Sequence, residues 1–550
     1  MISYNIILYL AAGFVIVLLA FLYARSRVNR LRKKRLEMIR ESWGKPKNEA
    51  FLFDRIDKYA SVSGEKEFHQ LSNQTIDDID FYRLFEFLDR TTSRIGQQFL
   101  FRKLIQPGSN SDDLKRLSER ADELNGNASL RESIQKELIR LNNNNAYYIT
   151  SLMEDKLLEK PVWFNYLFLD ILVVVTLLGL SFRFPILLLF LIIPVIINMI
   201  IHYWNKSNAM RFVKSFPQLN LLISISERMM KIYPNQNPGD IEKSIKDLSS
   251  FKRNSTILNL TQTGDIRDDL SQIGLYFVEL IKIFFLVEIF TLFYLIRELE
   301  TKKSSVTTLY RYIGEIDTAI SIASLRAGSK TCRPTFINNG KSLRAVSLYH
   351  PLIVNCVENN ITVNGKSVLI TGSNMSGKTT FLRTVMINSI LAQTLYTCFA
   401  EEFNAPILKQ FSSIRIDDSL LEGKSYYYEE VNIMASLIEE AKSGNQNLFI
   451  LDEVFKGTNT VERIASAKAI LSYLNGGNNI VIVSTHDIEL SALLNQEYDL
   501  YHFTETIEDQ QLHFDHMIKP GSLTTRNGIR ILELSGYPKE IIDEAKRLSS

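Results

Sequence analysis

The chain has 550 residues, of which 46% are hydrophobic and 23% are charged, and its formal net charge at pH 7 is +2. This length accommodates two to four domains. The nearly balanced charge excludes a chain-wide positive excess as a signal for nucleic acid. The three cysteines, Cys332, Cys356 and Cys398, lack the spacing of metal ligands and indicate free thiols in a reducing compartment.

The first predicted element is a membrane anchor. Residues 5–23 are apolar and uncharged, and about 20 such residues cross a bilayer as a helix. A cleaved signal peptide is the alternative, but its positive charges precede the apolar core. Here the charges follow, from Arg25 to Arg35, which places the N-terminus outside and the next residues in the cytoplasm. We expect an anchor at 1–24 and a basic helical linker at 25–75.

A second membrane element is predicted between two helical regions. Apolar residues recur every three or four positions within 76–160, and helical patterns return within 203–330. Between these regions lie two apolar blocks, 162–180 and 184–201. Together they predict a membrane hairpin at 161–202.

Two ionisable features bear on this membrane prediction. Asp170 lies inside the first arm, where a carboxylate marks a functional site by default. The alternative is a structural position at a helix contact or in a thinned bilayer, which the apolar surroundings favour. A further apolar block at 274–297 contains Glu279, Lys282 and Glu288. Each is costly at a bilayer centre, so we expect a long buried helix of a soluble domain there.

The stretch VLITGSNMSGKTTFLRTV at 368–385 predicts a strand, a phosphate-binding loop and a helix. The glycines of its G-x-x-x-x-G-K-T pattern let backbone N–H groups face phosphates. Lys378 supplies positive charge to the β- and γ-phosphates, and Thr379 supplies a hydroxyl to Mg²⁺. The positive end of the helix faces the same anion. The predicted nucleotide-binding residues are Gly372, Ser373, Asn374, Met375, Ser376, Gly377, Lys378, Thr379 and Thr380.

Two further strands carry predicted catalytic and metal-binding residues. The apolar strand 448–451 is followed by Asp452 and Glu453, and ligands bind at the carboxyl ends of parallel strands. Asp452 is predicted to hold Mg²⁺ together with Thr379, and Glu453 to polarise the attacking water as a general base. An ordinary acidic strand end is the alternative. A third strand ends in His486, which is placed to contact the γ-phosphate.

On these motifs the chain resembles the MutS family of ATPases. TGSNMSGKTTFLR at 371–383 is similar to the family's phosphate loop, and STHDIEL at 484–490 is similar to its histidine switch. LDEVFKGTNT at 451–460 looks like its Asp-Glu motif with the segment that reaches across a dimer. LDRTTSRIGQQFLFRKLIQP at 88–107 looks like the start of its lever helices, and SGYPKEIIDEAKRL at 535–548 looks like its closing helix.

The chain also departs from the family pattern. Phe455 stands where the family has glycine, and Asn459 stands where it has serine. The family's mismatch-recognition domain has no counterpart. These departures put mismatch recognition in doubt and leave the phosphate loop and Asp-Glu motif untouched.

The resemblance implies an α/β P-loop ATPase domain of the ABC type at 331–550, preceded by an all-α lever or core domain with transmembrane helices. It implies ATP and Mg²⁺ as cofactors. It also implies a homodimer in which Thr458, Asn459 and Thr460 of one subunit reach the nucleotide of the other. Because an anchor and a hairpin return the chain to the cytoplasm, we expect a multi-pass protein of the plasma (inner) membrane with a cytoplasmic ATPase domain.

Two functions remain open at this point. The first is a membrane-anchored ATPase that acts on duplex DNA and is related to mismatch repair. The second is ATP-driven remodelling of a membrane partner protein without DNA. A basic groove on the lever domain would favour the DNA function over the membrane function. The candidate residues for such a groove are Arg90, Arg94, Arg102 and Lys103. Alternating charge on a solvated helix face is the alternative explanation of these four residues.

Overall fold

The computed structural model forms two compact units, each made of three chain segments. Unit 1 comprises Met1–Gly64, Arg90–Phe101 and Ala121–Ser324, and unit 2 comprises Glu65–Asp89, Arg102–Arg120 and Leu325–Ser550. The division falls inside three helices, α6 (Arg94–Ile105), α7 (Ser111–Gly126) and α18 (Lys303–Gly328). The described residues are 18–19, 22–23, 25–27, 29–30, 33–62, 64, 68–154, 157–234, 238–255, 281, 283–337, 340–415, 426–455, 458–508, 511–523, 532–533 and 536–549. The predicted anchor at 1–24 therefore lies almost entirely outside them.

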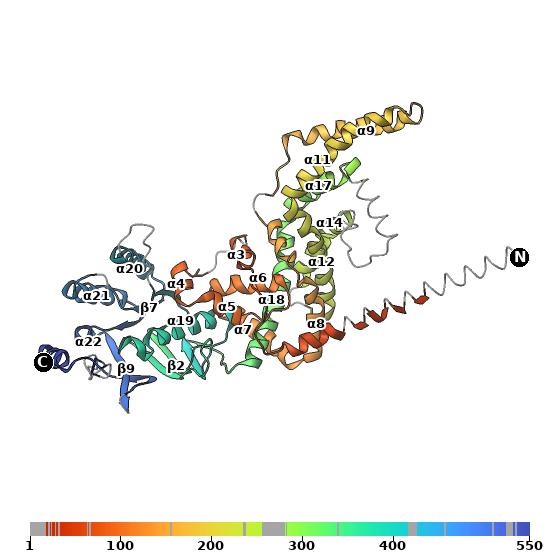
Figure 1. Ribbon diagram of the computed structural model, residues 1–550. Helices are drawn as coiled ribbons and strands as arrows, with labels where there is room; N and C mark the ends of the chain where they lie inside the picture. The colour runs from red at the N-terminus through yellow and green to blue at the C-terminus, as the bar shows by residue number, and fades with distance from the viewer. Residues whose placement is uncertain are drawn as a thin grey trace. The chain divides into compact units, whose positions relative to one another are not determined.

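The described part of unit 1 is helical (Figure 1). Besides its shares of α6, α7 and α18, its helices are α2 (Phe53–Ile56), α3 (Lys58–Val62), α8 (Ala128–Leu138), η1 (Ile139–Leu141), η2 (Ala146–Leu152), η3 (Val162–Tyr166), α9 (Leu167–Ser181), α10 (Leu187–Phe190), α11 (Ile192–Asn208), α12 (Met210–Ile232), α13 (Pro238–Asp247), α14 (Ser249–Asn254) and α17 (Val287–Glu300). Apolar side chains on one face of α12, among them Phe212, Phe216 and Leu219, are fully buried. This burial follows from the spacing of three and four residues that the sequence shows.

A buried carboxylate fixes the start of α6 in unit 1. Asp317 of α18 accepts hydrogen bonds from the backbone N–H groups of Thr92 and Ser93, both at 2.7 Å, and from Ser93 Oγ at 2.6 Å. These N–H groups precede the helix and lack partners within it, so a negative charge is favourable there. Burial nevertheless raises the pKa of Asp317 to about 6. A Cβ at Gly96 would lie 2.1 Å from Asp317 Oδ2, so only glycine fits at that position.

The predicted hairpin region contains two helical stretches long and apolar enough to cross a membrane, Val162–Ser181 and Leu187–Trp204. Only 17% and 22% of the residues in their most apolar windows are buried. A core helix of a soluble protein would be mostly buried, so these stretches differ from such helices. Their base packs on α17, where Leu286, Ile289 and Phe293 form a cluster with residues of η3 and α9.

The block predicted as a long buried helix at 274–297 is described at residue 281 and from 283 onward. Its last part lies in α17, which buries one face including Ile289, Leu292 and Phe293. Glu288 is buried on the same face, and its carboxylate lies 3.6 Å from Nδ1 of His202 on α11. Glu279 and Lys282 lie outside the described residues.

Unit 2 contains two β-sheets (Figure 1). The four-stranded sheet has the order β1-β5-β2-β3 and the six-stranded sheet has the order β10-β9-β4-β8-β7-β6. The strands are β1 (Thr335–Phe336), β2 (Ser342–Leu348), β3 (Asn359–Asn364), β4 (Ser367–Thr371), β5 (Glu402–Ala405), β6 (Lys409–Ser413), β7 (Asn447–Asp452), β8 (Ile480–Thr485), β9 (Tyr498–Glu508) and β10 (Gln511–Pro520). Five strands of the larger sheet are parallel and β10 is antiparallel to β9.

Helices cover both faces of the six-stranded sheet. Besides its shares of α6, α7 and α18, the described helices of unit 2 are α4 (Asn73–Asp78), α5 (Phe81–Leu88), η4 (Asn374–Ser376), α19 (Lys378–Leu395), α20 (Tyr426–Lys442), α21 (Thr460–Leu474), α22 (Ile488–Leu494) and α24 (Lys539–Ser549). Apolar side chains of α20, α21 and α22 pack with Phe449 and Leu451 of β7. Because strand side chains alternate between faces, Leu448 and Ile450 of the same strand face the other way. Helix α19 contacts β6, β7 and β8 and is absent from that cluster. The ends of β4, β7 and β8 therefore meet at one edge of a covered sheet.

Candidate active site

The glycine-rich loop connects β4 to α19 and requires both of its glycines. Gly372 has φ +143°, and a Cβ there would lie 2.9 Å from the backbone oxygen of Phe503. Gly377 has φ +109° and precedes the first residue of α19. Residues with side chains rarely adopt such values. The loop thus carries its N–H groups and the positive end of a long helix to the sheet edge, where an anion binds favourably.

Lys378 lies inside this loop, with only 1% of its surface exposed. Its Nζ donates to the backbone oxygens of Gly372 at 2.6 Å and Ser373 at 3.0 Å, and it lies 3.4 Å from Nε2 of His486. The loop therefore holds a cation at its centre, with nearby N–H groups arranged for an anionic ligand.

Asp452 and Thr379 meet at the same edge. Thr379 Oγ1 donates to Asp452 Oδ2 at 2.6 Å, and Ser484 Oγ donates to Asp452 Oδ1. Asp452 and Ser484 are register partners on the parallel strands β7 and β8. A carboxylate and a hydroxyl are hard oxygen ligands of the kind that Mg²⁺ prefers. Within the described residues no group of three or more His, Cys, Asp or Glu side chains is placed to hold a metal ion.

Glu453 and His486 form the next contact. His486 Nε2 lies 2.6 Å from Glu453 Oε1. Glu453 has φ +57°, and its backbone N–H donates to the oxygen of Ser484 at 3.0 Å. A left-handed conformation is uncommon for a residue with a side chain and occurs often at functional sites. The backbone therefore turns at the end of β7 and aims the carboxylate at the histidine.

The other predicted residues divide into two groups. Ser373 Oγ donates to Glu505 of β9 at 3.0 Å, Met375 is 73% exposed, and Thr380 lies in the first turn of α19. Asn374 and Ser376 belong to η4. Thr458, Asn459 and Thr460 instead stand at the start of α21. The backbone N–H of Glu462 donates to Asn459 Oδ1 at 3.0 Å, and the Glu462 carboxylate accepts from Thr458 Oγ1 at 3.1 Å. The backbone N–H of Arg463 donates to the backbone oxygen of Asn459 at 2.9 Å.

Several site residues could not be found from the sequence motifs. His516 of β10 lies with Nδ1 3.1 Å from the backbone oxygen of Ser376, and its ring stacks with Phe514 at 6.0 Å between centroids. Nothing in the sequence near His516 indicates this position, because a β-hairpin brings it to the loop. Ser484 precedes the expected histidine by two residues, and its role follows only from strand register.

An ion-pair group joins α19 to the start of α5. Arg383, five residues after Lys378, pairs with Asp80 at 3.0 Å, and Arg415 pairs with the same carboxylate at 2.9 Å. Asp78 accepts from Ser412 Oγ at 2.7 Å and from two backbone N–H groups that follow β6. Burial raises the pKa of Asp78, although these donors act in the opposite direction. Residues far apart in the chain thus connect the loop helix to α4 and α5.

Three of the four residues proposed for a basic groove, Arg90, Arg94 and Arg102, are buried or paired. Arg90 and Arg102 are 7% and 5% exposed. Arg94 makes a two-bond ion pair with Glu49 at 2.7 and 2.9 Å and lies over the ring of Tyr147. Arg90, Arg94 and Arg102 therefore fit neither the predicted basic groove nor a solvated helix face.

Comparison with known proteins identifies the part of the chain that carries this site. The family model MutS domain V matches residues 368–550. DNA mismatch repair protein MutS from Thermus thermophilus is 31% identical over 244 residues, which are 44% of this chain and 30% of that protein. The protein of the same name from Natronomonas pharaonis is 30% identical over 250 residues, 43% of this chain and 28% of the relative. The protein of the same name from Listeria monocytogenes is 32% identical over 254 residues, which are 44% of this chain and 29% of that protein. The match therefore spans less than a third of each relative.

Proposed function

The chain belongs to the MutS family, and from that premise we propose that it binds ATP with Mg²⁺ and hydrolyses it. The 2.6 Å contact between Thr379 and Asp452, beside the buried Lys378, carries this proposal. It places a hydroxyl, a carboxylate and a cation at the end of a helix that favours anions. These are the groups that nucleotide hydrolysis requires in P-loop enzymes.

The residues of the chain have separate tasks in this reaction. The loop N–H groups and Lys378 bind the phosphates, and Thr379 and Asp452 hold the metal ion. Mg²⁺, when bound, neutralises charge on the phosphate oxygens. Glu453 accepts the proton of the attacking water, and the new phosphorus–oxygen bond forms as the bond to the leaving ADP breaks. His486 contacts both Glu453 and Lys378. It orients the Glu453 carboxylate and contacts the γ-phosphate.

We propose that the working form is a homodimer. Thr458, Asn459 and Thr460 lie at the N-terminus of α21, a position that favours anions, and Thr458 and Asn459 are hydrogen-bonded there to Glu462. They are available to meet the nucleotide of a second copy. Closure of the dimer on ATP would shift α19, and the Arg383–Asp80 pair would pass this shift to α5.

Phosphate release from ATP tests the enzymatic proposal. Purified full-length protein should hydrolyse ATP only with Mg²⁺ present, and Asp452→Asn should lower the rate. Asp499→Asn on β9 makes the same charge change outside the site and should keep the wild-type rate. Equal rates for both variants, or a rate independent of Mg²⁺, would contradict the metal assignment.

We further propose that Val162–Ser181 and Leu187–Trp204 form a membrane hairpin and that the ATPase lies in the cytoplasm of a plasma-membrane protein. The large apolar residues exposed along both stretches support this, among them Leu169, Leu172, Ile193 and Ile200. A soluble protein rarely exposes so much contiguous apolar surface. ATP-driven motion of a membrane partner then follows as the first candidate activity.

Action on duplex DNA is the second candidate. The name of the relatives, DNA mismatch repair protein MutS, favours it, whereas the burial of Arg90 and Arg102 argues against two of the four cations first proposed for it. Filter binding of duplex DNA across a salt series separates the two candidates. If the protein contacts DNA phosphates, DNA binding should weaken steeply as the salt concentration rises. If no DNA is retained on the filter even at low salt, the membrane activity is the only candidate of the two that remains.

A further inference from the structure

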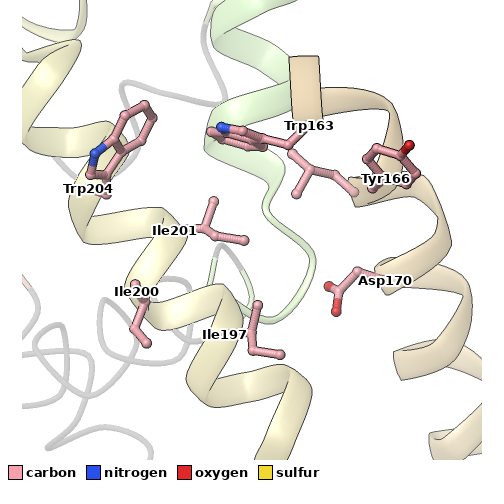
Figure 2. A pocket seen from close by; sticks show the side chains of 8 residues that line it. Trp163, Tyr166, Asp170, Ile197, Ile200, Ile201 and Trp204 are labelled. Atoms are coloured by element: carbon pink, nitrogen blue, oxygen red, sulfur yellow. The ribbon is translucent and has the colours of Figure 1, made fainter. Parts of the chain in front are cut away.

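A pocket opens between the two arms of the hairpin in unit 1. Its volume is about 390 Å³, within the range of about 300–1,000 Å³ typical of small-molecule sites. Trp163, Tyr166 and Asp170 approach from η3 and α9, and Ile197, Ile201 and Trp204 approach from α11 (Figure 2). The lining is therefore aromatic and aliphatic except for one carboxylate.

Asp170 determines the charge of the ligand. Among the residues described as lining this pocket, it is the only Asp, Glu, His, Lys or Arg. The side-chain nitrogen of Asn198 on α11 donates to the backbone oxygen of Phe284 at 3.1 Å, and Asp170 Oδ2 is buried without a hydrogen-bond partner among the described residues. The carboxylate points across the gap toward α11 (Figure 2). A buried acceptor of this kind is costly unless a cation or a donor reaches it.

The aromatic residues indicate the same charge. The Trp163 and Trp204 rings meet edge to face, with centroids 5.5 Å apart. Tryptophan and tyrosine rings attract cations, and quaternary ammonium groups are recognised by such aromatic arrangements. Ile197 and Ile201 provide an apolar wall for a hydrocarbon chain. A neutral hydrocarbon would leave Asp170 Oδ2 unpaired, and an anion would be repelled.

We propose that this pocket binds the alkylammonium group of a cationic amphiphile, with its nitrogen at Asp170 and its first methylene groups against Ile197 and Ile201. The inference rests on the proposed membrane hairpin. Trp163, Tyr166 and Trp204 are residues that favour the membrane–water interface, and Asp170 lies one helical turn beyond Tyr166. The amine therefore enters at the level of lipid headgroups, from an aminolipid or from a soluble amine.

Tryptophan fluorescence tests this proposal directly. The chain has three tryptophans, so Trp43→Phe leaves only the two that line the pocket. Full-length protein in dodecylmaltoside is titrated with 8-bromooctyltrimethylammonium or with 8-bromooctanol, whose bromine quenches a nearby indole. We expect the cation to bind at least tenfold more tightly than the alcohol. Asp170→Asn should abolish this preference, whereas Glu288→Gln, which changes a carboxylate outside the pocket, should retain it.

The outcomes separate the pocket from the membrane placement. Equal binding of cation and alcohol, or an unchanged preference in Asp170→Asn, would overturn the pocket proposal. Quenching of the same tryptophans by vesicles of brominated phosphatidylglycerol reports independently whether the hairpin inserts into a bilayer. If the vesicles do not quench these tryptophans, the membrane hairpin is refuted and the pocket proposal is judged by the amine titration. Competition by phosphatidylethanolamine would identify an aminolipid as the source of the amine, and lack of competition would identify a soluble amine.

Discussion

The sheet edge of unit 2 and the hairpin of unit 1 both gather polar groups, but they do so by different means. At the sheet edge, Asp452, Glu453 and His486 follow the ends of strands, and the register of β7 and β8 places them. In the hairpin region, Asp170, Asn198, His202 and Glu288 lie on three helices, and contacts between side chains place them. Backbone geometry thus fixes the first group, whereas helix packing fixes the second.

This difference predicts how each region responds to substitution. At the sheet edge, the backbone should survive the loss of a side chain, so chemistry should fail while folding persists. In unit 1, single contacts hold helix ends together, so substitutions there should change stability first.

The largest expected effect is the loss of the general base. Glu453→Gln keeps the shape of the side chain and removes its ability to accept a proton, so turnover should fall by about 10²–10⁴-fold. ATP binding should persist. The exposed Glu439→Gln on α20 is the matched control and should keep the wild-type rate. Single-turnover hydrolysis and nucleotide titration measure the two quantities, and a Glu453→Gln rate within threefold of wild type would show that another group activates the water.

Loss of the loop cation comes next. Lys378→Ala removes a buried, hydrogen-bonded charge from the phosphate site, a change that typically costs about 2–5 kcal/mol. ATP affinity should fall on the order of 10²–10³-fold, measured by isothermal titration. Lys366→Ala removes a partly exposed lysine just before β4, whose Nζ donates to the backbone oxygen of Asn495, and should change affinity little. Near wild-type affinity in Lys378→Ala would refute the assignment of this loop.

A pH dependence of stability should appear in unit 1. Burial raises the pKa of Asp317 from 3.8 to about 6, so the folded chain holds this proton more tightly than the unfolded chain. The contribution to stability is complete below about pH 4 and is lost as pH rises through about 6, a change of about 3 kcal/mol.

Asp317→Asn should remove that slope. Urea unfolding can be followed by tryptophan fluorescence, because Trp43, Trp163 and Trp204 all lie in unit 1. The difference in unfolding free energy between wild type and variant should change across pH 4–7. A constant difference would mean that Asp317 does not titrate in this range.

The smallest effect concerns the fit of α6 against α18. Gly96→Ala places a methyl group 2.1 Å from Asp317 Oδ2 and should destabilise unit 1 by about 1–3 kcal/mol. Gly126→Ala at the end of α7 meets nothing within 4 Å and should stabilise by about 0.4–1 kcal/mol. The same urea titrations measure both. If both variants shift stability in the same direction, the close approach of α6 and α18 is wrong.

The comparison also explains what the sequence could predict. The strand and helix on either side of the glycine-rich loop are present as β4 and α19, because the motif and its flanks are contiguous. The parallel pairing and burial of β4, β7 and β8 agree with their continuous apolar residues. The resemblance to the MutS family is confirmed by the match to residues 368–550.

Contacts between residues far apart in the chain could not be predicted from the sequence. Nothing near Asp80 indicates its pairing with Arg383, about 300 residues away. The burial of Arg90 and Arg102 was missed because their charges were interpreted on a helix considered alone. His516 reaches the loop only through a β-hairpin. Site residues that depend on packing between distant segments therefore required the structure.

We propose a MutS-family ATPase held at the cytoplasmic face by a membrane hairpin, and the side of the membrane on which the C-terminus lies tests this placement. Cysteine is introduced as Ser550→Cys after Cys332, Cys356 and Cys398 are replaced by alanine. We expect a membrane-impermeant maleimide to label this cysteine only after the cells are permeabilised. Labelling in intact cells would place the ATPase outside, where ATP is scarce, and would contradict the account.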